Sequence, residues 1–575
     1  MVSLDYIVIG LYFLSLIFVS WLTSRRIKSS EDMFIAGRNS SWWLSGMSTY
    51  MTLFSASTFV IWGGVSFRSG LVAALIGNIL GLACFAAGRW FAGRWRRMKI
   101  KSPGEFLTIR FGGRATINFY TICGIVGRGF HTAVALYAIA IVMSTLIELP
   151  EGHFFAGADG HLSVQWAIVL LGIITLIYTV TGGFLAVLMT DVIQFGVLMT
   201  IVLFMIPLSI DAVGGLENFI AQAPEGYFKP WSAEYPPFWL IMWFFLNLFT
   251  VAGDWPFVQR YLSVPTVKDA KRSNYLVGVL YLLTPIIWYF PAMAYHQLNP
   301  EANPEQAYIL MSKTVLMKGM LGVMLAAMIS ATLSCVSGTL NVFANVFTYD
   351  IYCAKYPDTP QKQQIAIGRR FTLIFGLSIL VLALLIPYAG GAEKVVVTIL
   401  TMVIGPLYLP SIWGIFSRRI TSSHVIWSML VTYALGFTLK FALGTKVHQQ
   451  LLESFIGLVI PLLVLTAFEL WARYRGKHQP GYDAIAERVD EEAETEPSPE
   501  VKRAVKSFSH MAVTCFMATV AAIAVMLAGL LVTEDFTESV RRIVVWSVVL
   551  IVAVVAAYVI YRIIDYRRDR AVDAK

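Results

Sequence analysis

Two acidic side chains stand inside long apolar stretches of this sequence. Asp191 lies in an otherwise apolar run, and Asp254 opens the sequence DWPFVQRYLS. A carboxylate in the apolar interior of a membrane is costly, so its presence indicates a function by default. Asp191 has a structural alternative, which is to anchor the cytoplasmic end of its helix. Asp254 has three alternatives: contact with a solute, capping of a broken helix, or pairing with Arg260.

A basic pair and a pair of serines are the next candidates. Arg128 and His131 are three residues apart, which places them on one face of a helix. A guanidinium binds a carboxylate by two parallel charge-assisted hydrogen bonds. Alternatively, Arg128 extends to the cytoplasmic face or pairs with one of the two aspartates, and His131 is a buried core histidine. Ser334 and Ser337 offer hydroxyl oxygens to a hard cation, or serve as small residues where helices pack.

These side chains belong to a chain that is mostly apolar. Of its 575 residues, 57% are hydrophobic and 14% are charged, and the mean hydropathy is +0.68. A soluble domain cannot bury so much apolar surface, so lipid must solvate much of it. A lipid-facing barrel is excluded, because its strands would alternate over about ten residues. The sequence therefore predicts an all-α polytopic membrane protein.

About fifteen apolar runs are long enough to cross a bilayer as helices. They lie near residues 4–23, 44–68, 71–93, 115–146, 165–185, 188–210, 237–262, 273–295, 316–349, 367–390, 394–417, 422–443, 452–474, 509–532 and 541–563. Lysine and arginine gather in every second loop, which predicts an outside N-terminus and a cytoplasmic C-terminus. These loops explain the net charge of +9 without nucleic acid as a partner. We expect a bacterial-type inner membrane protein with no obligate protein partner.

Two of the predicted spans carry residues that interrupt a helix. Span 44–68 has a cluster of hydroxyl residues between Gly46 and Gly63, and span 237–262 contains Pro256 directly after Asp254 and Trp255. Proline removes a backbone donor and clashes with the preceding turn. The two spans are five helices apart, which is the spacing of equivalent helices in two inverted five-helix repeats. Interrupted helices at matching positions of such repeats indicate the central site of a transporter.

Three stretches resemble the sodium:solute symporter family, which includes the sodium/glucose, proline and sialic-acid transporters. They read DMFIAGRNSSWWLSGMSTYMTLFSASTFVIWGG at 32–64, TGGFLAVLMTDVIQ at 181–194 and DWPFVQRYLS at 254–263. The resemblance covers about residues 2–419. It implies an extra N-terminal helix before two inverted five-helix repeats, and sodium-coupled import of a small polar solute, a sugar or an acidic sugar, by alternating access.

This architecture divides the chain into six predicted parts. They are an N-terminal helix and loop (1–43), the first repeat (44–234), the second repeat (235–419), accessory helices (420–476), an acidic cytoplasmic linker (477–508) and a C-terminal helical pair (509–575). The linker is rich in Glu, Asp and Pro, a composition that buries too little apolar area to fold alone. We expect it to be solvated and partly helical.

The resemblance also implies a sodium site between the first and eighth core helices. Its ligands would be the carbonyls of Met51, Phe54 and Ala331 and the hydroxyl of Ser334. Cys335 stands where the family has a second serine. A thiol is a poor sodium ligand, so water or Thr332 would take its place.

A second sodium ion would use Asp191 and Ser337. Gly338 stands where that pattern has a further serine. One sodium ion is therefore favoured over two.

The implied solute site lies between the interrupted helices. Ser55 and Thr58 would face the ligand, Asn78 would join them, and Asp254 opens the second break. Each solute hydroxyl that leaves water needs a partner, which hydroxyls and an amide supply. In the sialic-acid transporter an arginine of the same helix as Arg128 takes the substrate carboxylate.

Other functions have weaker support in the sequence. The chain contains no HExxH helix, nucleophile elbow, phosphate-binding loop or Cys/His metal spacing, so no enzyme is expected. A channel or a receptor is a rival from another class, although paired interruptions favour alternating access. Within the same fold, the alternatives are proton coupling through Asp191 and transport of a neutral sugar or an amino acid.

Overall fold

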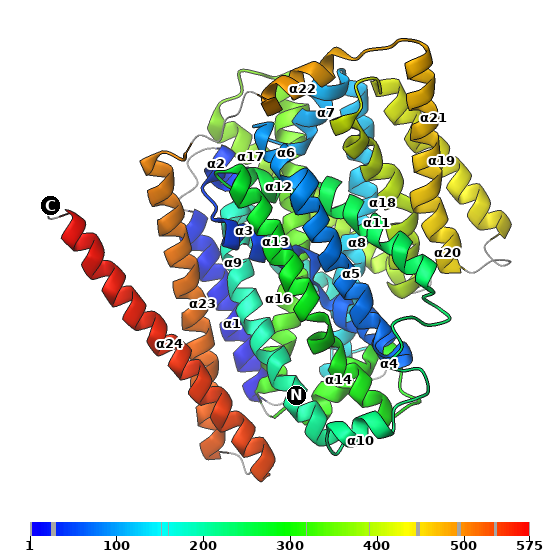
Figure 1. The fold of residues 1–575 in the computed structure, drawn as a ribbon. Helices are drawn as coiled ribbons and strands as arrows, with labels where there is room; N and C mark the ends of the chain where they lie inside the picture. Colours follow the sequence, from blue (N-terminus) through cyan, green and yellow to red (C-terminus); the bar gives the residue numbers. More distant parts are fainter. Residues whose placement is uncertain are drawn as a thin grey trace.

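The structure is a computed structural model that describes residues 3–24, 30–150, 152–158, 160–317, 319–389, 392–443, 449–490, 496–533 and 537–573, and the described chain is predominantly helical (Figure 1). Ten helices in these ranges are long and apolar enough to cross a membrane, and two bent helix pairs raise the number to twelve. Each of the fifteen predicted spans coincides with a helical segment. The predicted spans 165–185 and 188–210 both fall within the bounds of one helix, 164–212, in which the side chains of residues 178 and 181–183 lie outside the description.

The helices of the first half of the chain pack among those of the second half. They are α1 (Ser3–Ser24), α2 (Ser30–Ile35), α3 (Trp42–Leu53), a π-helical turn η2 (Thr58–Trp62), α4 (Gly63–Ser69), α5 (Val72–Ala87), η3 (Gly88–Ala92), α6 (Gly93–Arg97), α7 (Pro103–Phe111), α8 (Arg114–Leu146), α9 (Val164–Ala212) and α10 (Leu216–Ala221). The short 3₁₀ helix η1 (Ala36–Arg38) links α2 to α3.

The second half repeats the pattern of a broken helix followed by long spans. Its helices are α11 (Pro237–Gly253), α12 (Trp255–Ser263), α13 (Val267–Leu283), α14 (Pro285–Leu298), η4 (Pro304–Gln306), α15 (Ala307–Val315), α16 (Met320–Val346), η5 (Phe347–Cys353), α17 (Gln361–Leu385), η6 (Ile386–Ala389) and α18 (Ala392–Phe416). The accessory helices are α19 (Ser422–Leu443), α20 (Gln449–Ser454), η7 (Phe455–Val459), α21 (Ile460–Tyr474), α22 (Pro480–Asp490), α23 (Pro499–Thr533) and α24 (Glu538–Asp573).

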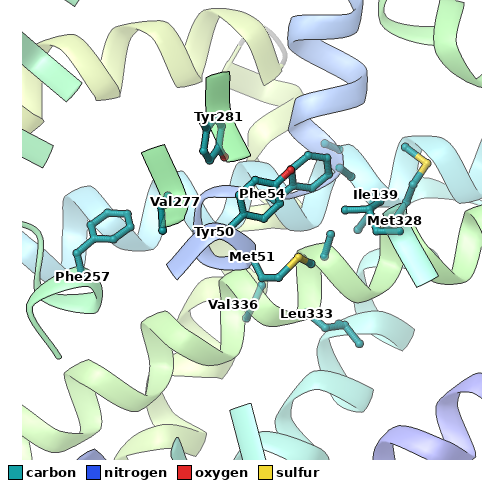
Figure 2. Packing of buried hydrophobic residues seen from close by; sticks show 14 of the residues in the cluster. Tyr50, Met51, Phe54, Ile139, Phe257, Val277, Tyr281, Met328, Leu333 and Val336 are labelled. Atoms are coloured by element: carbon teal, nitrogen blue, oxygen red, sulfur yellow. The ribbon is translucent and has the colours of Figure 1, made fainter. Parts of the chain in front are cut away.

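Helix α16 lies at the centre of the bundle. It packs against α1, α3, α8, α9 and α17, and its whole membrane-crossing stretch is buried within the protein. Figure 2 shows Tyr50, Met51 and Phe54 at the end of α3 among residues of α13 and α16. This packing fixes the end of α3 against the helix that carries Ser334.

Glycines bring α5 and α13 close together. A Cβ placed on Gly81 would lie 2.9 Å from the carbonyl oxygen of Gly278, and one on Gly278 would lie 2.8 Å from the ring of Phe85. Helix α3 approaches α13 in the same way, since a Cβ on Gly46 would lie 2.8 Å from the carbonyl oxygen of Ser273. Small residues at helix contacts let backbones approach closely in membranes, and here they join α3, α5 and α13.

Part of the predicted acidic linker is an ordered helix that packs on the bundle. Helix α22 lies against α7 (Figure 1), with Ile485 buried and Arg488 3.6 Å from Glu105. The ring of Tyr482 lies 5.8 Å from the guanidinium of Arg110, and burial of Arg110 lowers its pKa to about 10. The expected partial helicity is therefore present at residues 480–490, where Ile485 is buried while Asp483, Glu487 and Arg488 stay exposed. Residues 491–495 lie outside the description.

Candidate functional site

The first interruption lies between α3 and η2, where the chain bends by 61°. Phe54 is extended and its N–H donates to the carbonyl of Met51 at 3.2 Å. The N–H of Ala56, which no helix partner satisfies, donates to the hydroxyl of Thr332 on α16 at 3.0 Å. Unsatisfied backbone at this depth is stable only when other groups of the protein bond to it. The predicted break is therefore confirmed, and α16 supplies the missing acceptor.

The second interruption lies between α11 and α12, which meet at 51°. Asp254 is extended there, and its carbonyl accepts from the N–H of Phe257 at 3.0 Å. The break falls directly before Trp255 and Pro256, as the proline predicts. The two broken helices meet, because the hydroxyl of Ser45 donates to the carbonyl of Arg260 at 3.1 Å.

Asp191 is the centre of a buried polar network. The hydroxyls of Ser48 on α3 and Ser334 on α16 both donate to its carboxylate. Arg260 of α12 places Nη2 3.7 Å from Asp191 Oδ2 and donates from Nε to the Ser48 hydroxyl at 2.9 Å. All four side chains are buried. One carboxylate of α9 thus connects α3, α12 and α16.

This network includes one of the predicted hydroxyl ligands of sodium and leaves out the others. Ser334 donates to Asp191, so a residue assigned to the first sodium site contacts a residue assigned to the second. Ser337 instead donates to the carbonyl of Ser334 at 3.1 Å, within its own helix. The Thr332 hydroxyl, a predicted replacement for the thiol of Cys335, already accepts from Ala56 and donates to the Met328 carbonyl.

The other candidate residues of the sodium site lie at the same junction of α3 and α16. Met51, Phe54, Ala331 and Cys335 are all buried there. The carbonyl of Met51 already accepts one hydrogen bond, from Phe54. A carbonyl oxygen has two lone pairs, so this bond leaves an acceptor position on Met51 for a cation.

A cavity of about 120 Å³ lies beside the first interruption. Its wall combines hydroxyl, amide and cationic side chains with aromatic rings: Thr52, Thr58, Arg128, His131, Asn247, Thr250, Trp62, Trp243, Tyr281, Trp288 and Tyr289, together with Leu53, Ile76, Gly77, Leu80 and Leu246. A concave site that is mostly apolar with a few convergent polar groups is typical of small-molecule binding.

Arg128 on the cavity wall pairs with Asp254 of the second interruption. Arg128 Nη1 lies 3.1 Å from Asp254 Oδ2, and the Tyr408 hydroxyl donates to Asp254 Oδ1 at 2.8 Å. The guanidinium Nε is buried without a hydrogen-bond acceptor among the described residues. Of the sequence alternatives, the pairing of Arg128 with Asp254 is the one observed, and Arg260 pairs with Asp191 instead.

Three predicted solute residues, Ser55, Asn78 and Asp254, do not line this cavity, and Asp254 instead pairs with Arg128 on its wall. The hydroxyl of Ser55 lies outside its wall, although its carbonyl holds the N–H of Thr58 at 2.9 Å. Asn78 has its amide oriented toward the carbonyls of Tyr281, at 3.0 Å, and Ala74. The sequence alone could not exclude these positions, because all three residues are polar and lie at or beside an interruption.

Comparison with known proteins identifies the family. The profile of the sodium:solute symporter family matches residues 33–432, well over half of the chain. This chain belongs to the sodium:solute symporter family. The sodium/sialic acid symporter NanT of Aliivibrio fischeri is 26% identical over 456 residues, covering 75% of this chain and 86% of NanT. The sodium/glucose cotransporter of Vibrio parahaemolyticus is 24% identical, covering 81% of this chain and 90% of its own.

Solved structures show the same fold for this symporter family member. A substrate-bound, outward-open sodium-coupled sialic acid symporter matches with a TM-score of 0.71 at 22% identity, covering 83% of this chain and 99% of its own. MHP1, a nucleobase-cation-symport-1 family transporter, matches with a TM-score of 0.54 at 17% identity. The predicted fold class, two inverted five-helix repeats with accessory helices, is confirmed.

Sequence reasoning missed several residues of this symporter's candidate site. The sequence pattern indicates Arg260 only as a partner of Asp254, and it gives Ser48 no role apart from the hydroxyl cluster between Gly46 and Gly63. Charge balance gave a usable signal for Arg260, since a buried carboxylate needs a cation. The cavity residues Asn247 and Thr250 give a weaker signal, because both side chains bond to carbonyls of their own helix, at 2.8 Å each.

Proposed function

We propose that this protein couples inward movement of sodium to import of a small polar solute by alternating access. The observation that carries the proposal is the Asp191 network, in which one carboxylate of α9 contacts one further helix of the proposed first repeat and two helices of the second. The family supports sodium as the coupling ion. A sodium ion crossing a potential of ~100 mV releases about 2.3 kcal/mol, equivalent to nearly 50-fold in concentration.

The ion is proposed to bind where Asp191 and Ser334 meet the end of α3. A carboxylate, a hydroxyl and backbone carbonyls of Met51, Phe54 and Ala331 are oxygen ligands of the kind that hard cations require. Arg260 is the other positive partner of Asp191. Sodium and Arg260 therefore compete for one carboxylate.

This competition suggests how ion and solute become linked. Arg260 belongs to α12, and α12 begins directly after Asp254, the residue that holds Arg128 on the cavity wall. A shift of Arg260 on ion binding would move α12 and change how Arg128 is presented to the solute. By thermodynamic reciprocity, the solute must then strengthen ion binding by the same factor.

The cavity supports a sugar or an acidic sugar, such as a sialic-acid-like or uronate-like compound, as the solute. Aromatic rings offer flat apolar faces, and Thr58, His131 and Asn247 offer polar groups on the wall. The unpaired Nε of Arg128 is a donor for a carboxylate. A neutral sugar is the second candidate, favoured by the Asp254 carboxylate that already balances the charge of Arg128.

A matched serine pair tests the ion site. The hydroxyl of Ser334 donates to Asp191. The hydroxyl of Ser337, one turn away on the same helix, donates to the backbone carbonyl of Ser334. In proteoliposomes with an inward sodium gradient, Ser334→Ala should raise the sodium concentration for half-maximal uptake about tenfold, the loss of roughly one charged hydrogen bond. Ser337→Ala should leave it unchanged if one sodium ion is used. An equal effect of both variants would indicate a second sodium site, and no effect of Ser334→Ala would remove it from the ligands.

Collapse of the proton gradient separates sodium coupling from proton coupling through Asp191. Uptake that persists with sodium and a protonophore present, with the membrane potential clamped, supports the proposal. Uptake driven by an imposed proton gradient in sodium-free buffer would contradict it.

We also propose a plasma-membrane location with the N-terminus outside. The α1 end that carries the N-terminus lies opposite the end that holds α6, α7 and α22 (Figure 1), and the loops at that second end are rich in arginine and lysine. The division into repeats at residues 44–234 and 235–419 is part of the same proposal. A fluorescent protein fused to the C-terminus should fluoresce if that end is cytoplasmic, while an alkaline phosphatase fusion there should be inactive.

A further inference from the structure

The C-terminal helical pair contains a basic cavity that no transport step uses. A cavity of about 510 Å³ lies between α23 and α24. Its wall includes Arg503, Lys506 and His510 of α23 and Arg562 of α24. The two helices form the outer edge of the bundle and separate toward the C-terminal end (Figure 1). None of the residues on the cavity wall belongs to the helices that carry the proposed ion and solute sites.

One carboxylate is shared among the cations of this cavity. Asp565 lies 3.4 Å from Lys506, 3.4 Å from His510 and 3.8 Å from Arg562. Arg503, Lys506, His510 and Arg562 thus place four basic side chains on the wall of one cavity, and Asp565 lies beside three of them. Arg562 and Lys506 are 38% and 44% exposed, so their donors are accessible to a ligand.

Helix α24, on one side of this cavity, exposes most of its apolar surface. Only 6% of the membrane-crossing stretch of α24 is buried within the protein, and its exposed residues include Val552, Val559 and Ile563. The Thr514 hydroxyl lies 2.7 Å from the Tyr558 hydroxyl, which joins α23 to α24. The cations lie between this polar bridge and the N-terminal end of α23 or the C-terminal end of α24. The long apolar segments of both helices lie on the other side of the bridge. This order of charged and apolar residues is that of a membrane interface.

We propose that this cavity binds the phosphate of an anionic phospholipid headgroup. Guanidinium groups of Arg503 and Arg562 suit a phosphodiester, because they donate two parallel hydrogen bonds to phosphate oxygens. Basic pockets between membrane helices on the cytoplasmic side bind anionic headgroups by this chemistry. Asp565 opposes binding, since its carboxylate occupies the same cations. The site would attach the peripheral helical pair to anionic lipid rather than to another protein.

Native mass spectrometry of the full-length protein tests this inference, with phosphatidylglycerol and phosphatidylcholine as probes. The wild type should retain phosphatidylglycerol in preference to phosphatidylcholine. The double variant Arg503→Gln/Arg562→Gln should retain it about 30-fold less, since each basic residue near a membrane surface contributes about 1 kcal/mol and about 1.4 kcal/mol corresponds to tenfold. Arg541→Gln/Arg542→Gln, at the opposite end of α24, is the matched control and should behave as the wild type.

Asp565→Asn gives a test of opposite sign that a folding defect cannot imitate. Removal of the competing carboxylate should increase phosphatidylglycerol retention severalfold. Equal retention by the wild type and the Arg503→Gln/Arg562→Gln variant would overturn the proposal. So would equal thermal stabilisation by inorganic phosphate alone with no further effect of phosphatidylglycerol, because the ligand would then be a free anion.

Discussion

Helices α16 and α24 are both long enough to cross a membrane, yet their surroundings differ. The membrane-crossing stretch of α16 is entirely buried in protein, whereas 6% of that of α24 is buried. Helix α16 carries Ser330, Ser334, Ser337 and Asn341 in its middle, while the corresponding part of α24 is mostly valine, isoleucine and alanine. Hydroxyls and amides are tolerated in α16 because neighbouring helices supply partners. The polar content of a span, more than its length, therefore indicates where the function lies.

The largest effect is expected when the buried carboxylate of Asp191, which bonds to Ser334 of α16, is neutralised. Asp191→Asn removes the negative charge that Ser48, Ser334 and Arg260 share. Sodium-driven uptake should fall at least about 100-fold, and loss of the partner of a buried Arg260 should cost about 3–5 kcal/mol of stability. Uptake and the thermal midpoint in detergent measure the two effects.

The double variant Asp191→Asn/Arg260→Gln distinguishes these effects. Removal of both charges should restore much of the thermal midpoint, since no unpaired charge remains, but it should not restore transport. Recovery of sodium-driven uptake in the double variant would mean that Asp191 serves only to balance Arg260.

A smaller and more selective effect is expected at the cavity wall. Arg128→Ala should reduce uptake of a carboxylated solute by about tenfold to 100-fold, because a charge-assisted hydrogen bond contributes about 1.5–3 kcal/mol. Competition between labelled carboxylated and neutral sugars measures the selectivity. Arg128→Ala/Asp254→Asn is the control for the unpaired aspartate. An equal loss for both kinds of sugar in the double variant would assign Arg128 a structural role.

Alanine in place of a glycine should destabilise the protein more in the buried helix α16 than in the peripheral helix α23. A Cβ on Gly322 of α16 would lie 2.5 Å from the carbonyl oxygen of Asp5, whereas a Cβ on Gly529 of α23 would meet no atom of the described residues within 4 Å. Gly322→Ala should cost about 1–3 kcal/mol, and Gly529→Ala should be neutral or stabilising by up to about 1 kcal/mol. Thermal midpoints of the two variants, measured side by side, test this difference; equal midpoints would contradict the close approach of α1 and α16.

The smallest effect is expected on the lipid face of α24. Val552→Ala changes a side chain that is 54% exposed in the protein. Stability should change by less than about 0.5 kcal/mol, and uptake should be unchanged. A large loss of either would mean that a second protein surface covers α24.

Much of the fold follows from the sequence, and less of the site does. The lengths of the apolar runs and the position of Pro256 predict the spans and the second break, because both depend on local chemistry. The contact between Ser334 and Asp191 does not follow, since it joins residues 143 positions apart. The surroundings of Asn78 do not follow from the sequence either, because its side-chain amide lies beside the carbonyls of Tyr281 and Ala74, and Tyr281 is far from it along the chain. The packing of α22 also depends on a tertiary surface, formed by α7, that composition does not describe.

The glycine contacts among α3, α5 and α13 have a mechanical consequence. Because backbone meets backbone there, with Gly81 and Gly278 opposite each other, these helices have little room to slide past one another or to rotate separately. Any exchange of exposure between the two faces of the membrane has to carry them together as a single block. The deformation must then be absorbed at the bends beside Phe54 and Asp254, where the helical hydrogen-bond ladder is already open.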